Sequence, residues 1–153
     1  MDTYSPSRPP CERSGYTLVE TILVLGFLGV SLATTVPRFH EARDRIAVRS
    51  AREAVIGLLS RARHHAVLRG GAEVLVSEPL QTLVLRSSAG TVEILDLSPA
   101  HDVELEIEGA GGEVTVLFDA LGLGRVASRT LVLRRGDVAS RVIISSYGRA
   151  RRA

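Results

Sequence analysis

The chain has 153 residues, a net charge of +2 and a hydrophobic content of 45%, which suits one modest domain with an extra apolar segment and leaves no room for a second, catalytic domain. All 19 basic residues are arginines. The single cysteine, Cys11, excludes a disulfide framework, a cysteine zinc site and a cysteine nucleophile if it is removed with a leader. Charge is segregated: residues 38–69 sum to +5, 70–118 to −8 and 119–153 to +6.

Residues 16–37 form an apolar run in which Glu20 is the only charged residue. At about 1.5 Å per residue, a helix of this length just spans a bilayer core of roughly 30 Å. The polar segment before it carries Arg8 and Arg13, and basic charge stays on the cytoplasmic side of the membrane. The sequence therefore predicts a single-pass inner-membrane anchor with an exported C-terminal part.

Two features separate this run from an ordinary secretory signal. A secretory signal has its small-residue cleavage site after the apolar run, whereas the small residue Gly15 lies before it. Glu20 is costly in a membrane helix, by about 2.5 kcal/mol or more, and such a carboxylate usually has a partner. Cleavage after Gly15 would leave the helix on the mature protein and create an α-amino group close to Glu20.

The segment from Arg13 through Gly15, Tyr16 and Glu20 into the apolar helix resembles the class III signal of type IV pilins and type II secretion pseudopilins. The resemblance implies that a prepilin peptidase removes residues 1–15 and methylates Tyr16, where the family usually has Phe or Met. It implies that Glu20 pairs with the N-terminal amine of a neighbouring subunit and that the helix bends or melts at Pro37 in filaments. The alternative is a plain anchor whose Glu20 lies near the membrane interface.

Residues 38–69 continue the helix, because apolar residues recur every three to four positions until Gly70 and Gly71 supply a stop. The opposite side is basic, with Arg43, Arg45, Arg49, Arg52, Arg61 and Arg63. These arginines could bind an acidic polymer, but the sequence favours a solvated face or contact with acidic neighbouring subunits.

After Gly71 the hydrophobic pattern changes to period two, in short runs separated by turn residues. The expected strands are centred on residues 74–76, 83–85, 92–95, 103–107, 114–118, 131–133 and 142–144. We expect an antiparallel meander or a pair of small sheets packed on the helix. The fold class is α+β: a long helix with a membrane-spanning first half and an amphipathic second half on a C-terminal β domain, so that residues 38–153 form the exported globular part.

The C-terminal half, with Phe118-Asp119, a hairpin at Gly136-Asp137 and the ending Gly148-Arg149-Ala150-Arg151, resembles the GspH/FimT group of minor pilins and pseudopilins. Some members carry a Gly-Arg-x-Arg ending implicated in DNA binding during natural transformation. A flexible Gly148 would present Arg149, Arg151 and Arg152 to the phosphates of double-stranded DNA without reading sequence. The alternative is a frayed tail or a strand end that packs against acidic neighbours.

Nothing in the sequence supports catalysis, and no cofactor or metal is expected. His64 and His65 are adjacent on a helix and project to different sides, which does not suit a shared metal. Glu104, Glu106 and Glu108 line one strand face, where like charges indicate solvent exposure.

The expected function is a minor pilin of a type IV pilus, with other subunits, the peptidase and DNA as partners, in the inner membrane and then in a periplasmic or surface filament. The alternative is a GspH-type pseudopilin of a type II secretion system without a nucleic-acid role.

Overall fold

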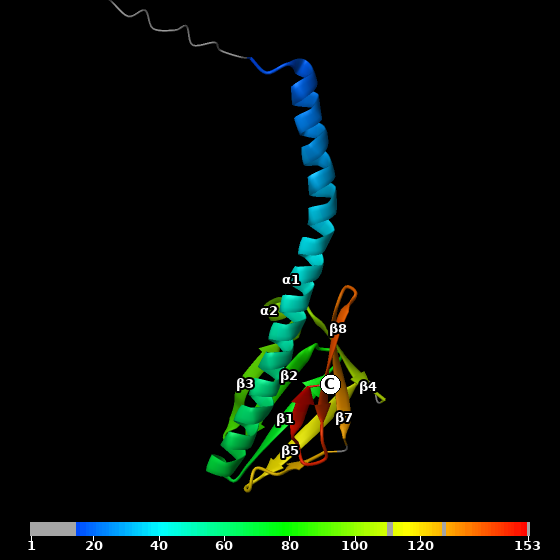
Figure 1. Cartoon of the computed structure of the whole chain (residues 1–153). Coiled ribbons are helices and arrows are strands. Elements are labelled where there is room, and N and C mark those ends of the chain that lie inside the picture. The colour runs from blue at the N-terminus through cyan, green and yellow to red at the C-terminus, as the bar shows by residue number, and fades with distance from the viewer. Residues whose placement is uncertain (1–14, 110–111, 127, 153) are drawn as a thin grey trace, which may run out of the picture. The chain divides into compact units, whose positions relative to one another are not determined.

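The computed structural model describes residues 15–109, 112–126 and 128–152, and the chain divides into two compact units, one ending at Arg38 and one beginning at Phe39. Helix α1 (Leu18–Arg69) contributes to both units. In the part that the structure describes, nine strands and one short helix, α2 (Leu97–His101), follow α1 (Figure 1). The predicted α+β class, a long N-terminal helix with an antiparallel β domain, is confirmed.

Two antiparallel sheets make up the β domain. The first has the spatial order β3-β2-β1-β5-β6 and contains β1 (Gly71–Ser77), β2 (Thr82–Ser87), β3 (Gly90–Asp96), β5 (Glu113–Asp119) and β6 (Gly124–Arg125). The second has the order β4-β7-β8-β9 and contains β4 (Glu104–Glu108), β7 (Arg129–Arg135), β8 (Val138–Ile144) and β9 (Ala150–Arg152).

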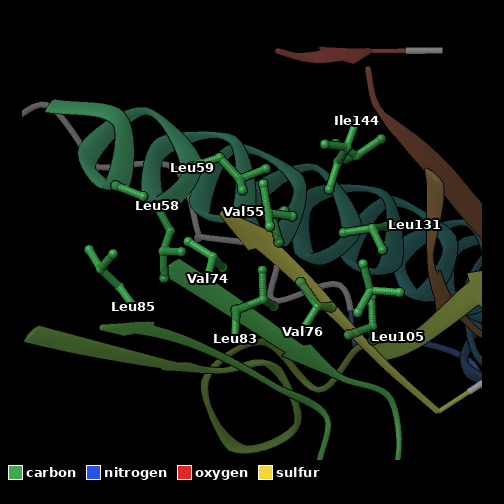
Figure 2. Packing of buried hydrophobic residues seen from close by; sticks show 14 of the residues in the cluster. Val55, Leu58, Leu59, Val74, Val76, Leu83, Leu85, Leu105, Leu131 and Ile144 are labelled. Atoms are coloured by element: carbon green, nitrogen blue, oxygen red, sulfur yellow. The ribbon is translucent and has the colours of Figure 1, made fainter. Parts of the chain in front are cut away.

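The core lies between the second half of α1 and both sheets. The buried helix residues recur every three to four positions and are Val48, Ala51, Val55, Leu58, Leu59, Ala62 and Ala66. Figure 2 shows Val55, Leu58 and Leu59 beside the strand residues Val74 and Leu83. Burying one such side chain fully contributes about 1.5–3 kcal/mol relative to leaving it exposed. This shared core fixes the second half of α1 on the β domain.

The period-two pattern located all seven expected strands. The predicted 103–107 strand is shifted by one residue, because pairing with β7 begins at Glu104, while Val103 is buried just before it. Three elements were missed: α2, β6 and β9, which have five, two and three residues. Gly70 and Gly71 end α1 as predicted, with φ of +82° and +155°.

The outer edge of β4 is covered by side chains from the turn between β1 and β2. The amide of Gln81 donates to the carbonyl oxygen of Leu105 (2.9 Å) and accepts from its N–H (2.5 Å). A carboxylate oxygen of Glu78 accepts from the N–H of Ile107 (3.1 Å). Gln81 has φ +56°, a left-handed conformation that non-glycine residues rarely adopt. Gln81 thus takes the place of a neighbouring strand and joins the two sheets.

Candidate functional site

Helix α1 begins with a side-chain cap that places Glu20 in its first turn. The hydroxyl of Thr17 accepts a hydrogen bond from the N–H of Glu20 (3.2 Å), and the carbonyl of Thr17 accepts from the N–H of Thr21 (3.1 Å). This is half of the capping box that Thr-x-x-Glu sequences form. A carboxylate in the first turn is stabilised by the helix dipole. Within the described residues Glu20 has no ion pair.

The first part of α1 is long and apolar enough to cross a membrane. Every side chain from Gly15 to Ala33 is exposed, including the cleavage-site candidate Tyr16. Pro37 lies inside α1. Of the proposed leader, residues 1–15, the structure describes only Gly15. Cys11 and Arg13 therefore lie outside the described residues.

The C-terminal candidate residues begin in a tight turn between β8 and β9. The N–H of Gly148 donates to the carbonyl of Ser145 (2.8 Å), and the N–H of Ser145 donates to the carbonyl of Arg149 (3.0 Å). Gly148 has φ +74° and is buried, and a Cβ there would lie 2.7 Å from Cε1 of Phe118. The expectation that Gly148 is flexible is therefore wrong, because this glycine fills a close-packed position that a side chain would not fit.

A second glycine holds this turn against the other sheet. The N–H of Gly124, at the start of β6, donates to the carbonyl of Tyr147 (2.9 Å). A Cβ on Gly124 would lie 2.4 Å from Cα of Gly148. The backbones of β6 and of the turn therefore touch directly, and the turn has a fixed position.

Strand β9 points its arginines to two different sides. Arg151 lies opposite the exposed Ile143 of β8, whereas Arg152 lies opposite the buried Val142. Because side chains alternate along a strand, Arg151 faces outward and Arg152 faces α1. Arg152 Nη2 forms an ion pair with Glu53 (3.0 Å).

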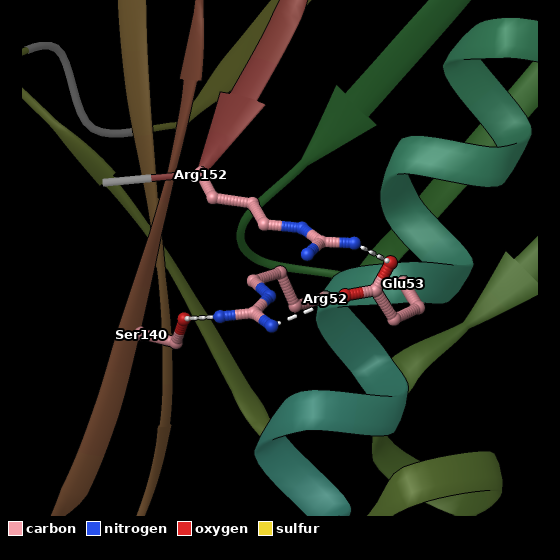
Figure 3. Close-up of polar contacts among 4 residues, drawn as sticks. All are labelled: Arg52, Glu53, Ser140 and Arg152. Atoms are coloured by element: carbon pink, nitrogen blue, oxygen red, sulfur yellow. Dashed lines mark hydrogen bonds and ion pairs between the residues drawn. The ribbon is translucent and has the colours of Figure 1, made fainter.

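Glu53 links Arg152 to a network on α1 (Figure 3). Arg52 donates to Glu53 (3.1 Å) and to the hydroxyl of Ser140 on β8 (3.3 Å). The hydrogen bond from Arg52, together with the charge and hydrogen bond of Arg152, holds the pKa of Glu53 below its ordinary value. Arg152 is thus committed to a contact inside the subunit and lies on the opposite side of β9 from Arg151.

Arg149 instead lines a depression together with an arginine from the helix. A depression of about 180 Å³ lies between α1 and the C-terminal turn, and its polar lining comes from Ser60, Arg63 and Arg149. Arg63 also lies over the ring of Phe118, 5.9 Å from its centroid. Arg149 and Arg151 are exposed, and neither has an ion pair among the described residues. Two guanidinium groups and a hydroxyl suit an oxyanion such as a phosphate.

The sequence pattern did not connect Ser60 or Arg63 with Arg149. The sequence pattern places Arg63 on the basic helix face, and its separation from Arg149 along the chain gives no sign that the two residues line one depression. In the part of the chain that the structure describes, no group of three or more His, Cys, Asp or Glu residues is arranged to hold a metal ion.

A long helix with an exposed apolar beginning, joined to an antiparallel β domain, is the architecture of the type IV pilins. The structure is similar to the crystal structure of the type IV minor pilin FimU of Pseudomonas aeruginosa (strain PAO1), with a TM-score of 0.55 and 22% sequence identity, covering 71% of this chain and 90% of that chain. This likeness shows the pilin fold.

A likeness in sequence extends over almost the whole chain. It is 29% identical over 160 residues to the pilin-like protein PilA1 of Thermus thermophilus, covering 91% of this chain and 97% of that protein. No family model matches the sequence. The chain is thus similar in fold to a type IV minor pilin and similar in sequence to a pilin-like protein.

Proposed function

We propose that this chain is a minor subunit of a type IV pilus, cut by a prepilin peptidase and assembled with other pilin subunits through its apolar helix. The observation that carries the proposal is the first part of α1, whose apolar side chains are exposed along the described length and whose first turn holds Glu20. An apolar helix of this kind requires a membrane before assembly and neighbouring helices afterwards. The likeness to a pilin-like protein supports the pilus.

Cleavage between Gly15 and Tyr16 is the first expected result. The small residue, the aromatic residue and the cap at Thr17 lie directly before α1, so that a peptidase would meet them at the membrane surface. Intact-mass measurement of protein from isolated filaments should show loss of residues 1–15 and a methyl group on Tyr16. Assembled protein that retains Met1 to Gly15 contradicts the proposal.

The alternative is a GspH-type pseudopilin, which would share the cleavage but work in type II secretion. Isolated filaments distinguish the two machines by composition. A pilus subunit is recovered at low, constant stoichiometry with the major pilin, and its deletion leaves secretion unchanged. Recovery with secretion components and a secretion defect on deletion would favour the pseudopilin.

A DNA-binding role is the second part of the proposed function, and the depression between α1 and the C-terminal turn favours it. Arg63 and Arg149 line this depression, and Arg151 lies exposed two residues further along. Neither Arg149 nor Arg151 is neutralised by a carboxylate among the described residues. Contacts of this type go to phosphates, so that we expect binding to double-stranded DNA without sequence preference.

Replacing Arg149 and Arg151 together by Gln should remove most DNA binding while leaving the melting temperature nearly unchanged, because exposed charges add little to stability. Two to three phosphate contacts give a log-log salt slope of roughly −2 to −3. The salt slope of the double variant should be less steep by about 2, because two phosphate contacts are removed. Fluorescence anisotropy of the processed full-length protein in detergent, titrated at several salt concentrations, measures both quantities.

The matched control for this experiment is Arg86→Gln with Arg134→Gln. It makes the same change in net charge on two exposed strand positions away from the C-terminal turn. Equal loss of binding in both double variants would show a general charge effect and would contradict a site at the turn.

A further inference from the structure

Tyr147 presents an exposed aromatic ring on a fixed backbone. Its side chain is 71% exposed, while its carbonyl accepts the hydrogen bond from Gly124 (2.9 Å) and the next residue, Gly148, is buried. A tyrosine has few rotatable bonds, so that contact with a flat partner costs little conformational entropy. An exposed ring held in this way is suited to contact a partner face on.

The surroundings of the ring indicate which partner. Arg149 follows Tyr147 by two residues in the chain and lines a depression with Ser60 and Arg63, so that the polar side chains lining this depression are two cations and a hydroxyl. Aromatic rings beside backbone-binding cations are the arrangement by which proteins hold unpaired nucleic-acid strands, with a base stacked on the ring and phosphates on the cations. Paired bases inside a duplex do not expose their faces to such a ring.

We propose that the C-terminal turn binds single-stranded DNA, with one base stacked on Tyr147 and adjacent phosphates held by Arg149, with Arg63 and Ser60, and by Arg151. The proposal rests on the DNA-binding role proposed above. It adds that single-stranded DNA is preferred over double-stranded DNA and that Tyr147 is the residue responsible for this preference. Double-stranded DNA would engage the same arginines without the stacked base. Unpaired strands are therefore bound more tightly than the duplex of the same sequence.

The test uses the processed full-length protein in detergent and fluorescence anisotropy with three labelled probes: a mixed-sequence oligonucleotide of about 20 nucleotides, its duplex, and an abasic oligonucleotide of the same length. Tyr147→Ala should weaken binding of the single strand at least about fivefold, since one stacked base contributes this much or more. Binding of the duplex and of the abasic strand should change less than about twofold. Tyr147→Phe should retain the wild-type preference.

Leu121→Ala is the control for general loss of exposed apolar surface. Leu121 is 79% exposed in the loop that precedes Gly124, and its removal should leave all three affinities unchanged. A Leu121→Ala effect equal to that of Tyr147→Ala would show non-specific apolar contact and overturn the stacking proposal.

Three further outcomes overturn the proposal and differ in what they leave standing. If Tyr147→Ala leaves single-strand binding intact while the Arg149 and Arg151 double variant abolishes binding, the ring has no part in the site and the DNA role survives. If the wild-type protein binds none of the probes, the DNA role itself fails. Loss of filament incorporation in Tyr147→Ala without a change in DNA affinity would assign the ring to a subunit contact instead.

Discussion

Glu20→Ala should insert into the membrane as well as or better than the wild-type protein and fail to enter filaments. Insertion improves because an isolated carboxylate in a membrane helix costs about 2.5 kcal/mol or more. Assembly fails because the variant leaves the new α-amino group of a neighbouring subunit without its partner. Removing one member of a buried ion pair costs about 3–5 kcal/mol, so that incorporation should drop at least about a hundredfold.

The measurement is a comparison of membrane-fraction protein with sheared-filament protein by immunoblot, in cells that express each variant in place of the wild type. Glu41→Ala is the matched control, because Glu41 is another exposed helix carboxylate, paired with Arg45 in its own subunit. Normal filament incorporation of Glu20→Ala would contradict a pairing between the Glu20 carboxylate and the α-amino group of a neighbouring subunit.

Gly124→Ala should strongly destabilise the β domain. Its new methyl group would lie 2.4 Å from Cα of Gly148, so that two backbones must separate. Over-packing of this kind costs about 3 kcal/mol, which lowers the melting temperature by roughly 10 °C in a domain of this size. Thermal unfolding followed by circular dichroism on the processed protein in detergent measures this change.

Gly57→Ala is the matched control for that substitution. Gly57 lies inside α1, and a Cβ there meets only the far end of the Arg61 side chain, at 3.1 Å. Alanine is favoured over glycine in a helix by about 0.5–1 kcal/mol, so that this variant should melt at the wild-type temperature or slightly above it. A Gly124→Ala protein that melts within about 1 °C of wild type would contradict the direct contact between the turn and β6.

The fold could largely be predicted because its main elements are long and regular in pattern. The helix from residue 38 to 69 has an apolar residue every three to four positions, and the seven strand centres follow a period of two. The missed elements depend on tertiary contacts instead. β9 has three residues and forms by pairing with β8, and β6 has two residues beside the tight turn at Gly148.

The candidate site could be predicted only in part, for the same reason. The Gly-Arg-x-Arg ending predicts Arg149 and Arg151 as site residues from the sequence alone, and their role stays a prediction. Three properties of the site depend on the packing of α1 on the sheets: Arg152 pairs with Glu53, Arg63 and Arg149 line one depression, and Gly148 is buried. No local pattern reports contacts between residues so far apart along the chain.

Under the proposed function, many copies of the membrane-anchored subunit lie close together before assembly, and the side chain of Gln81 has a consequence for this stage. An open strand edge is a template for pairing with a neighbour, and repeated pairing produces irreversible aggregates. At β4 this edge is blocked, because Gln81 and Glu78 already hydrogen-bond the backbone groups of Leu105 and Ile107 that an incoming strand would need. A pool of waiting subunits is thereby protected at that edge from fusing into a continuous sheet, at the cost of one strained residue.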